Sequence, residues 1–188
     1  MCGGIVVLSG PSGSGKDAVI DEWRLLEPRV TEVTTYTTRA MRAGETNGVD
    51  YHFVTSEQFG ALASEGDLLE WKEVHGKLYG SPARQTDDLV TTGKIAVLKI
   101  DVQGARDVRL KRPEAVSIFL MPPSLEALEE RLRKRATETE EQIQTRLENA
   151  RLEIACANEY EFVVVNDDLK RCAQEVHQIV SGRLKCLR

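Results

Sequence analysis

The chain has 188 residues, with 30 acidic and 25 basic side chains and a formal net charge of −5 at pH 7. A chain of this length can form one domain with small inserted units and can bury a full core. The acidic balance argues against a protein that coats nucleic acid or lies on a membrane surface, because such proteins are usually basic. Chemistry on small molecules is the class of function that fits best.

The cysteines and the apolar runs favour a cytoplasmic protein. The four cysteines, Cys2, Cys156, Cys172 and Cys186, are far apart and form no Cys-x-x-Cys pair, so we expect reduced thiols instead of a zinc site or a disulfide framework. No apolar run approaches the roughly eighteen residues of a membrane span, and the N-terminus lacks the basic region and apolar core of a signal peptide. We therefore expect a soluble protein that binds neither nucleic acid nor a membrane.

The first elements of the chain predict a phosphate-binding loop. Residues 5–8 form a continuous apolar run, typical of a strand buried on both faces, and residues 18–26 have helical spacing. Between them lie Gly10, Pro11, Ser12, Gly13, Ser14, Gly15 and Lys16. The glycines let successive backbone N–H groups converge on an anion, and the lysine can reach the outer phosphates. A strand, a glycine loop and a helix N-terminus in this order predict nucleotide binding.

One position departs from the pattern of a phosphate-binding loop. The residue after the lysine is usually Ser or Thr, whose hydroxyl ligates Mg²⁺, but here Asp17 is followed by Ala18. A carboxylate could hold Mg²⁺ directly or through water. It also adds negative charge beside the phosphates, and an acidic residue in a first helical turn can simply complement the helix dipole. We expect a metal role for Asp17 and keep the structural alternative open.

The rest of the chain alternates strands and helices. Strands are predicted at residues 30–35, 51–54, 68–74, 77–79, 95–100, 115–120 and 162–165, and helices at 56–66, 82–92, 102–111, 124–134, 140–159 and 169–184. The polar stretch 36–50 is too long for a simple connection, and loops of this length are usually functional or disordered. The alternation predicts an α/β fold, with a parallel sheet covered by helices on both faces and ligands beyond the carboxyl ends of its strands.

Residues 34–53 concentrate side chains that suit a phosphate monoester. Arg39 and Arg42 offer a fixed fork of donors for phosphate oxygens, and Tyr51 can add a hydrogen bond without adding charge. A solvated loop would explain these residues almost as well. The nearby phosphate-binding loop favours the phosphate site.

Seven segments occur in the order found in guanylate kinases: GPSGSGK, TTRAMRAGETNGVDYHF, LLEW, YGS, KIDVQGAR, RATETEEQIQTRL and VNDDL. The chain resembles this family through nearly its whole length. The resemblance implies Mg²⁺-dependent transfer of phosphate from ATP to GMP, and to dGMP. It also implies a P-loop core of residues 1–33, 86–128 and 152–188, a GMP-binding unit of residues 34–85 and a lid of residues 129–151.

The resemblance also implies the site. The residues that would hold GMP are Thr35, Arg39, Arg42, Tyr51, Glu70, Tyr79, Ser81 and Asp101. Those that would hold ATP are Gly10, Pro11, Ser12, Gly13, Ser14, Gly15, Lys16, Asp17 and Asn166. Lys16, Arg42, Arg135 and Arg146 would be catalytic and stabilise charge on the moving phosphoryl group. By their carboxylate chemistry, and not by the resemblance, Asp17 and Asp101 are the candidates to hold Mg²⁺, directly or through water.

The chemistry of Glu70 agrees with a guanine ligand. A carboxylate accepts hydrogen bonds from both N1–H and N2–H₂ of guanine, whereas the N1 of adenine carries no proton. A site that leaves buried polar groups unpaired can reject the wrong base by about 10⁴-fold. The alternative reading of Glu70 is an exposed strand residue beside Trp71.

Some residue roles stay open. Asp101 suits either the metal or the guanine, and Asn166 suits either an adenine contact or the N-cap of the last helix. Arg135 and Arg146 could instead lie on a solvated helix face with i,i+4 pairs among the glutamates.

Two rival functions also remain. The loop ending Gly15-Lys16-Asp17 resembles that of ribose 1,5-bisphosphate phosphokinase, but Glu70 makes most sense if a base is read. The other rival is a non-catalytic guanylate-kinase-like binding module, although Lys16 and the lid arginines are present here. The sequence leaves monomer and homo-oligomer open.

Overall fold

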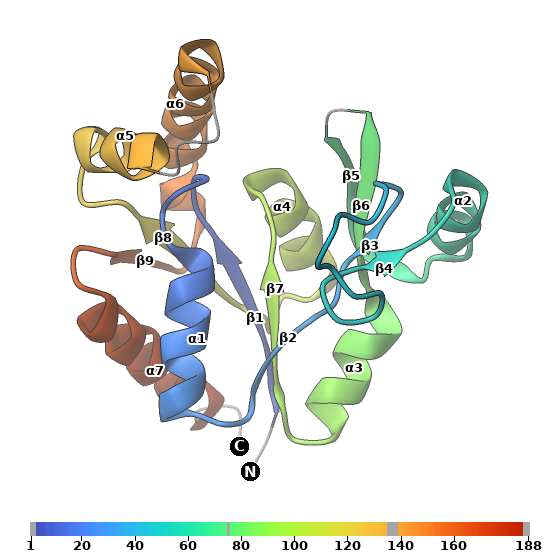
Figure 1. Ribbon diagram of the computed structural model, residues 1–188. Coiled ribbons are helices and arrows are strands. Elements are labelled where there is room, and N and C mark those ends of the chain that lie inside the picture. The colour runs from blue at the N-terminus through green and yellow to red at the C-terminus, as the bar shows by residue number, and fades with distance from the viewer. Residues whose placement is uncertain (1–2, 75, 135–138, 186–188) are drawn as a thin grey trace.

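A parallel sheet of five strands forms the centre of the protein (Figure 1). The computed structural model describes residues 3–74, 76–134 and 139–185. The strand order is β2-β7-β1-β8-β9, and all neighbours are parallel. The bounds are β1 (Gly4–Ser9), β2 (Val30–Glu32), β7 (Ile95–Lys99), β8 (Val116–Met121) and β9 (Phe162–Val165). The predicted α/β class with a parallel sheet is confirmed.

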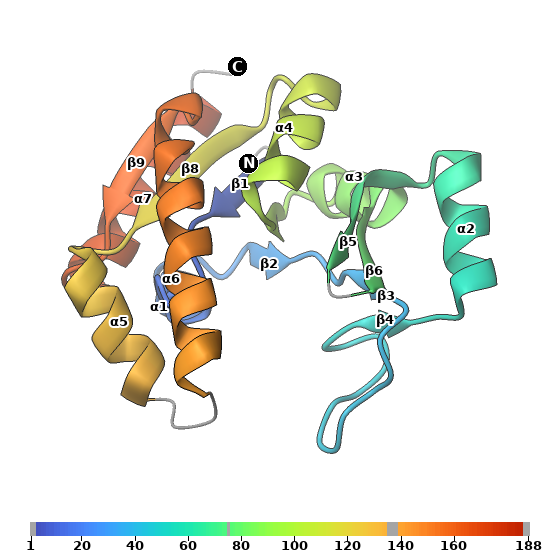
Figure 2. The same ribbon diagram turned by 90° about the horizontal axis from the view of Figure 1, so that it is seen from above.

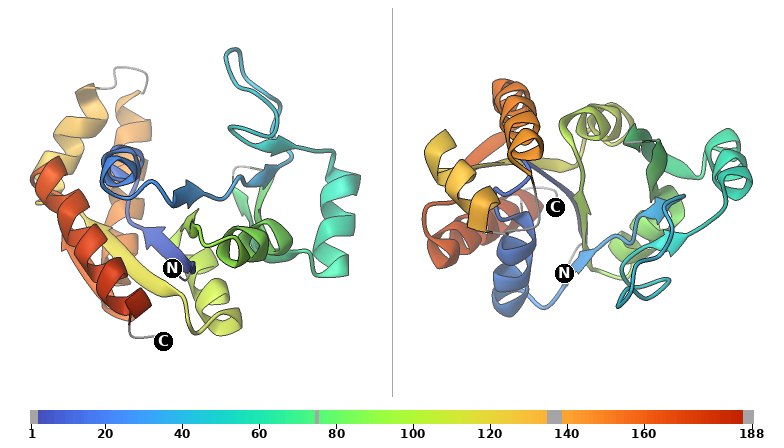
Figure 3. Two further views of the ribbon diagram at one scale, coloured as in Figure 1. Left: turned by 90° about the horizontal axis from the view of Figure 1, so that it is seen from below. Right: turned by 45° about the horizontal axis from the view of Figure 1, so that its top comes forward.

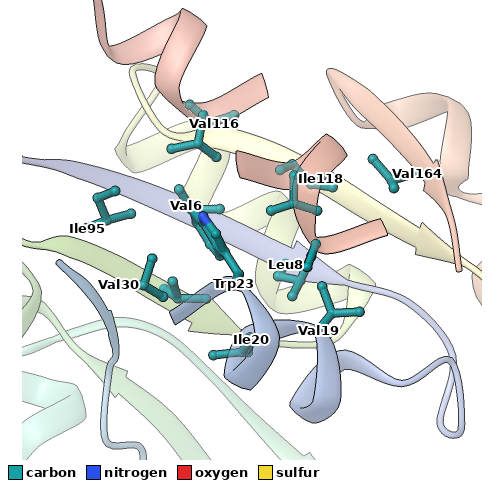
Figure 4. Close-up of a cluster of buried hydrophobic side chains, with 14 of the residues drawn as sticks. Val6, Leu8, Val19, Ile20, Trp23, Val30, Ile95, Val116, Ile118 and Val164 are labelled. Atoms are coloured by element: carbon teal, nitrogen blue, oxygen red, sulfur yellow. The ribbon is translucent and has the colours of Figure 1, made fainter. Parts of the chain in front are cut away.

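Helices cover both faces of this sheet, as alternate residues of β1 demonstrate. Val6 and Leu8 belong to a core cluster with α1 (Lys16–Leu26) and α7 (Leu169–Lys185), where Trp23 is fully buried (Figure 4). Ile5 and Val7 belong to a second cluster with α3 (Ala83–Thr91) and α4 (Val102–Lys111). Successive strand side chains point to opposite faces, so a continuous apolar run is what two covered faces require.

A second sheet of four strands lies beside the first. Its order is β4-β3-β6-β5, with bounds β3 (Tyr36–Thr37), β4 (His52–Phe53), β5 (Leu68–Val74) and β6 (Lys77–Pro82). The hairpin of β5 and β6 was predicted, although β6 continues to Pro82. Helix α2 (Ser56–Glu65) begins with a capping box in which Thr55 and Gln58 bond each other's backbone N–H.

The expected strand over 30–35 is wrong in its second half. β2 ends at Glu32, and the next strand, β3, belongs to the other sheet. The reason is tertiary: β2 pairs with β7, whereas Tyr36 pairs with Gly80 of β6. The chain therefore crosses from one sheet to the other near Val33, and the expected loop over 36–50 starts with a strand.

Helices α5 (Leu125–Lys134) and α6 (Glu140–Ala155) pack on each other around a small apolar cluster of their own. They lie at the opposite end of the molecule from α2 (Figures 2 and 3). The predicted helix over 140–159 ends early, because a short 3₁₀ helix, η1 (Ala157–Glu159), turns the chain toward β9. Tyr160 then packs edge-on against Phe119, with ring centroids 5.2 Å apart. Each helix in the described ranges is too short or too polar to cross a bilayer.

Candidate active site

The phosphate-binding loop joins β1 to α1, and its own lysine hydrogen-bonds back to two of its carbonyls. Gly15, the residue before α1, has φ 94°, and a Cβ there would lie 2.5 Å from Nδ2 of Asn166. Only glycine meets both demands without strain. The Lys16 ammonium donates to the carbonyls of Gly10 (2.6 Å) and Pro11 (3.2 Å), so this side chain lies along the loop.

Glu70 is a buried carboxylate at the face between the two sheets. Its side chain comes from β5, is 5% exposed, and accepts a hydrogen bond of 2.6 Å from Ser81 Oγ on β6. Burial raises the pKa of Glu70, and the charge of Asp101 adds to the rise against the Ser81 hydrogen bond. The alternative of an exposed Glu70 is wrong; its neighbour Trp71, at 48% exposure, is the outward residue.

Helix α4 closes over this carboxylate because Gly104 has no side chain. A Cβ at Gly104 would lie 2.6 Å from Glu70 Oε2. Asp101, the N-cap of α4, accepts from the Gly104 N–H at 2.7 Å and so fixes this first turn. Gly104 is thus the residue that lets α4 approach Glu70.

The predicted phosphate-binding residues gather at β3 and β4. Arg39 makes a two-pronged ion pair with Glu45, at 2.6 and 3.0 Å, and its guanidinium lies 5.3 Å from the centre of the Tyr51 ring. Tyr51 and Tyr79 meet edge-on, with centroids 6.0 Å apart. The hydrogen bonds to Glu45 raise the pKa of Arg39, so the guanidinium stays protonated. Arg42 is exposed, and its backbone N–H also donates to Glu45.

A cleft of about 900 Å³ separates the two sheets and is lined by six of the predicted site residues. Arg39, Arg42, Ser81, Lys16 and Asn166 are not part of its lining. This volume lies within the range typical of ligand sites, about 300–1,000 Å³. Its lining includes these residues named above: Asp17, Thr35, Tyr51, Glu70, Tyr79 and Asp101. The cleft therefore runs from the buried carboxylate of the second sheet to the first turn of α1.

Comparisons with known proteins agree with this geometry. The family model described as guanylate kinase matches residues 3–183. The chain belongs to the guanylate kinase family. It is 44% identical to the guanylate kinase of Rubrobacter xylanophilus over 178 residues, which is 95% of this chain and 93% of that one, and 44% identical to that of a Mycobacterium species over 96% of this chain and 92% of that one. The solved guanylate kinase of Anaplasma phagocytophilum has a TM-score of 0.74 and 36% identity, over 96% of this chain and 86% of that one.

Two residues outside the phosphate-binding loop hydrogen-bond to its backbone or to each other and hold it in place. Asn166, 5% exposed, donates from Nδ2 to the Ser14 carbonyl at 2.7 Å. Arg131 on α5 donates to the carbonyls of Asn166 (2.9 Å) and Ser14 (3.4 Å). The N-cap alternative for Asn166 is wrong, because Asp168 accepts the Arg171 N–H at the start of α7. The support from Arg131 has no local sequence signal, since its partners are distant in the chain.

Of the two lid arginines predicted to be catalytic, one lies within the described residues. Arg146, on α6, donates to Ser12 Oγ at 2.7 Å and so already reaches the phosphate-binding loop. This contact shows that α6 faces the loop. Arg135 lies outside the described residues.

Sequence reasoning missed Lys99 at the end of β7. Its ammonium lies 2.5 Å from Asp17 Oδ1 and 2.6 Å from Glu32 Oε1, and it lines the cleft. A lysine inside the otherwise apolar run 95–100 was the available signal.

The described residues do not form a protein cage for a metal. Within the described ranges no group of three or more His, Cys, Asp or Glu side chains could hold an ion. Mg²⁺ in nucleotide sites usually takes one or two carboxylates and completes its shell with phosphate oxygens and water. Asp17 and Asp101 on the cleft wall fit that partial role.

Proposed function

We propose that the protein transfers the γ-phosphate of ATP to GMP, and to dGMP, giving ADP and the nucleoside diphosphate. The observation that carries this proposal is the buried Glu70 carboxylate, set in the same cleft as the first turn of the phosphate-binding helix. A buried acceptor of this kind suits the N1–H and N2–H₂ of guanine. The relatives described above are guanylate kinases, which supports the same activity.

In this proposal GMP lies across the second sheet. Glu70 accepts from the guanine edge, with Thr35, Ser81 and Asp101 beside it. The phosphate is held by Arg39, Arg42, Tyr51 and Tyr79, which requires Arg39 to exchange Glu45 for phosphate oxygens. Charge-assisted bonds from arginine to phosphate are among the strong ones, so this exchange is feasible on binding.

ATP takes the phosphate-binding loop, residues 10–17, with Asn166 behind it. A phosphate oxygen of GMP attacks the γ-phosphorus, the bond from γ-phosphorus to its bridging oxygen breaks, and ADP leaves with that electron pair. The chain forms no covalent bond in this step. Lys16, Arg42, Arg135 and Arg146 stabilise the charge that spreads over the transferring group, and alignment supplies most of the catalysis.

Mg²⁺ is the expected cofactor, and Asp17 and Asp101 are the residues proposed to hold it, directly or through water. When bound with ATP, the ion neutralises charge on the β- and γ-phosphates.

The test is ADP production from Mg-ATP with GMP, dGMP, AMP, CMP, UMP or ribose 1,5-bisphosphate as acceptor. The proposal expects turnover with the guanine nucleotides and a loss of all turnover in Lys16→Met. Turnover with the sugar phosphate alone would assign the rival phosphokinase activity. GMP binding without turnover would assign a binding module.

A further inference from the structure

Lys99 lies between two acidic side chains at the carboxyl edge of the central sheet. The sheet order places β7 between β2 and β1. The end of β7 therefore meets Glu32 of β2 on one side. On its other side lies the first turn of α1, the helix that follows β1. The ammonium contacts both carboxylates, at 2.6 Å and 2.5 Å. The Lys99 side chain is 30% exposed, whereas that of Asp17 is 73% exposed.

Lys99 lowers the negative charge that a bound phosphate would meet at the start of α1. A phosphate-binding loop normally has a neutral hydroxyl at position 17. An unmatched carboxylate there would repel phosphates at the N-terminus of α1, which otherwise attracts anions. Asp17, Lys99 and Glu32 together carry one negative charge, whereas the two carboxylates without Lys99 would carry two. Glu32 lies on the far side of β7 from α1 and holds the ammonium in place.

We propose that Lys99 is a positioning residue for nucleotide binding: it neutralises Asp17 and ties that carboxylate to β7, so that the N-terminus of α1 accepts phosphate despite the acidic residue after Lys16. This inference rests on the proposed nucleotide site. Lys99 acts through Asp17 and does not itself contact the substrate.

The test is calorimetric binding of ADP in EDTA at low ionic strength. Lys99→Met should weaken metal-free ADP binding about tenfold, because it removes the cation that lies 2.5 Å from Asp17 and so raises the negative charge beside the phosphates. Asp17→Ser in the same chain should restore binding to within about twofold of wild type. With excess Mg²⁺ the loss in Lys99→Met should shrink to about threefold, since a divalent cation screens the carboxylate.

A matched control removes a different lysine from the same cleft. Lys72 lines the cleft and pairs with Asp107 at 3.4 Å, away from α1. Lys72→Met also deletes one positive charge but leaves Asp17 paired, so its metal-free ADP affinity should change by less than about twofold. Lys99→Arg, which retains the charge, should likewise bind ADP nearly as wild type does.

Three outcomes count against the inference. Unchanged metal-free binding in Lys99→Met would overturn it, and so would a loss that persists in the Asp17→Ser double variant. If Lys99→Met does not fold, Asp17→Ser alone decides: with Lys99 in place it should tighten metal-free ADP binding about threefold, and unchanged or weaker binding would overturn the idea. A wild-type protein that binds no ADP at all would instead refute the proposed function.

Discussion

The two ends of the proposed GMP site are built in opposite ways. Glu70, at the base-reading end, is 5% exposed, bonded to Ser81 and covered by the first turn of α4. Arg39, at the phosphate-binding end, lies at a polar loop and is already paired with Glu45. If these residues hold GMP as proposed, base recognition is preorganised by burial, whereas phosphate recognition requires an internal ion pair to open.

Among these variants, Glu70→Gln should have the largest effect on base recognition. The amide presents a donor where guanine also has donors, so we expect kcat/KM for GMP to fall about a thousandfold. ADP affinity and thermal stability should change little, because the phosphate-binding loop is untouched. The measurement is steady-state kinetics with GMP beside ADP calorimetry. An equal loss of ADP binding would mean that Glu70 supports the fold and does not read the base.

Gly104→Ala should damage the same end through packing. The new Cβ would lie 2.6 Å from Glu70 Oε2, so either the carboxylate or α4 has to shift. We expect KM for GMP to rise about thirtyfold with a smaller change in kcat, as measured by steady-state kinetics. Gly60→Ala in α2 is the matched control, because a Cβ there meets nothing within 4 Å. A KM in Gly104→Ala equal to that of the control would refute the close approach.

As the pH is lowered, base recognition should weaken at a higher pH than it would if Glu70 had the pKa of an ordinary carboxyl group. Burial, more than the Asp101 charge, raises the pKa of Glu70 above its usual 4.5, against the opposing effects of Ser81 and Lys72. Guanine needs the ionised carboxylate, so affinity is present above this raised pKa and is lost as the pH falls through it, by up to about tenfold per pH unit below it.

Guanosine is the right ligand for that titration, because the phosphate of GMP itself titrates near pH 6. Wild-type affinity for guanosine should begin to fall well above pH 4.5, and Glu70→Gln should show a weak but flat profile. Constant wild-type affinity down to about pH 4.5 would contradict the raised pKa.

The contrast between the two ends also explains what the sequence could predict. Local patterns were enough for the phosphate-binding loop, for the apolar strand β7 and for the hairpin that carries Glu70. They were not enough for contacts between distant elements: α4 reaches Glu70 across 34 positions of the chain, and Arg131 reaches Ser14 across 117. The break between β2 and β3 was also missed, because only the pairing partners decide to which sheet a short strand belongs.

Glu45→Gln tests the phosphate-binding end and has the smallest expected effect. An amide oxygen at the Oε2 position can still accept from Arg39 Nη1 and from the Arg42 N–H. The second hydrogen bond from Arg39 and the charge that competes with phosphate are gone. We expect GMP to bind about threefold tighter at low salt, with guanosine affinity unchanged, as measured by calorimetry.

Glu27→Gln is the matched control, since Glu27 makes a similar two-pronged pair with Arg29 at the end of α1. That variant should bind GMP as wild type does. Weaker GMP binding in Glu45→Gln would mean that Glu45 holds Arg39 in its working position, and the phosphate-binding end would then be preorganised like the base-reading end. Tighter binding would establish that Arg39 exchanges one anion for another, which is the physical difference between the two ends.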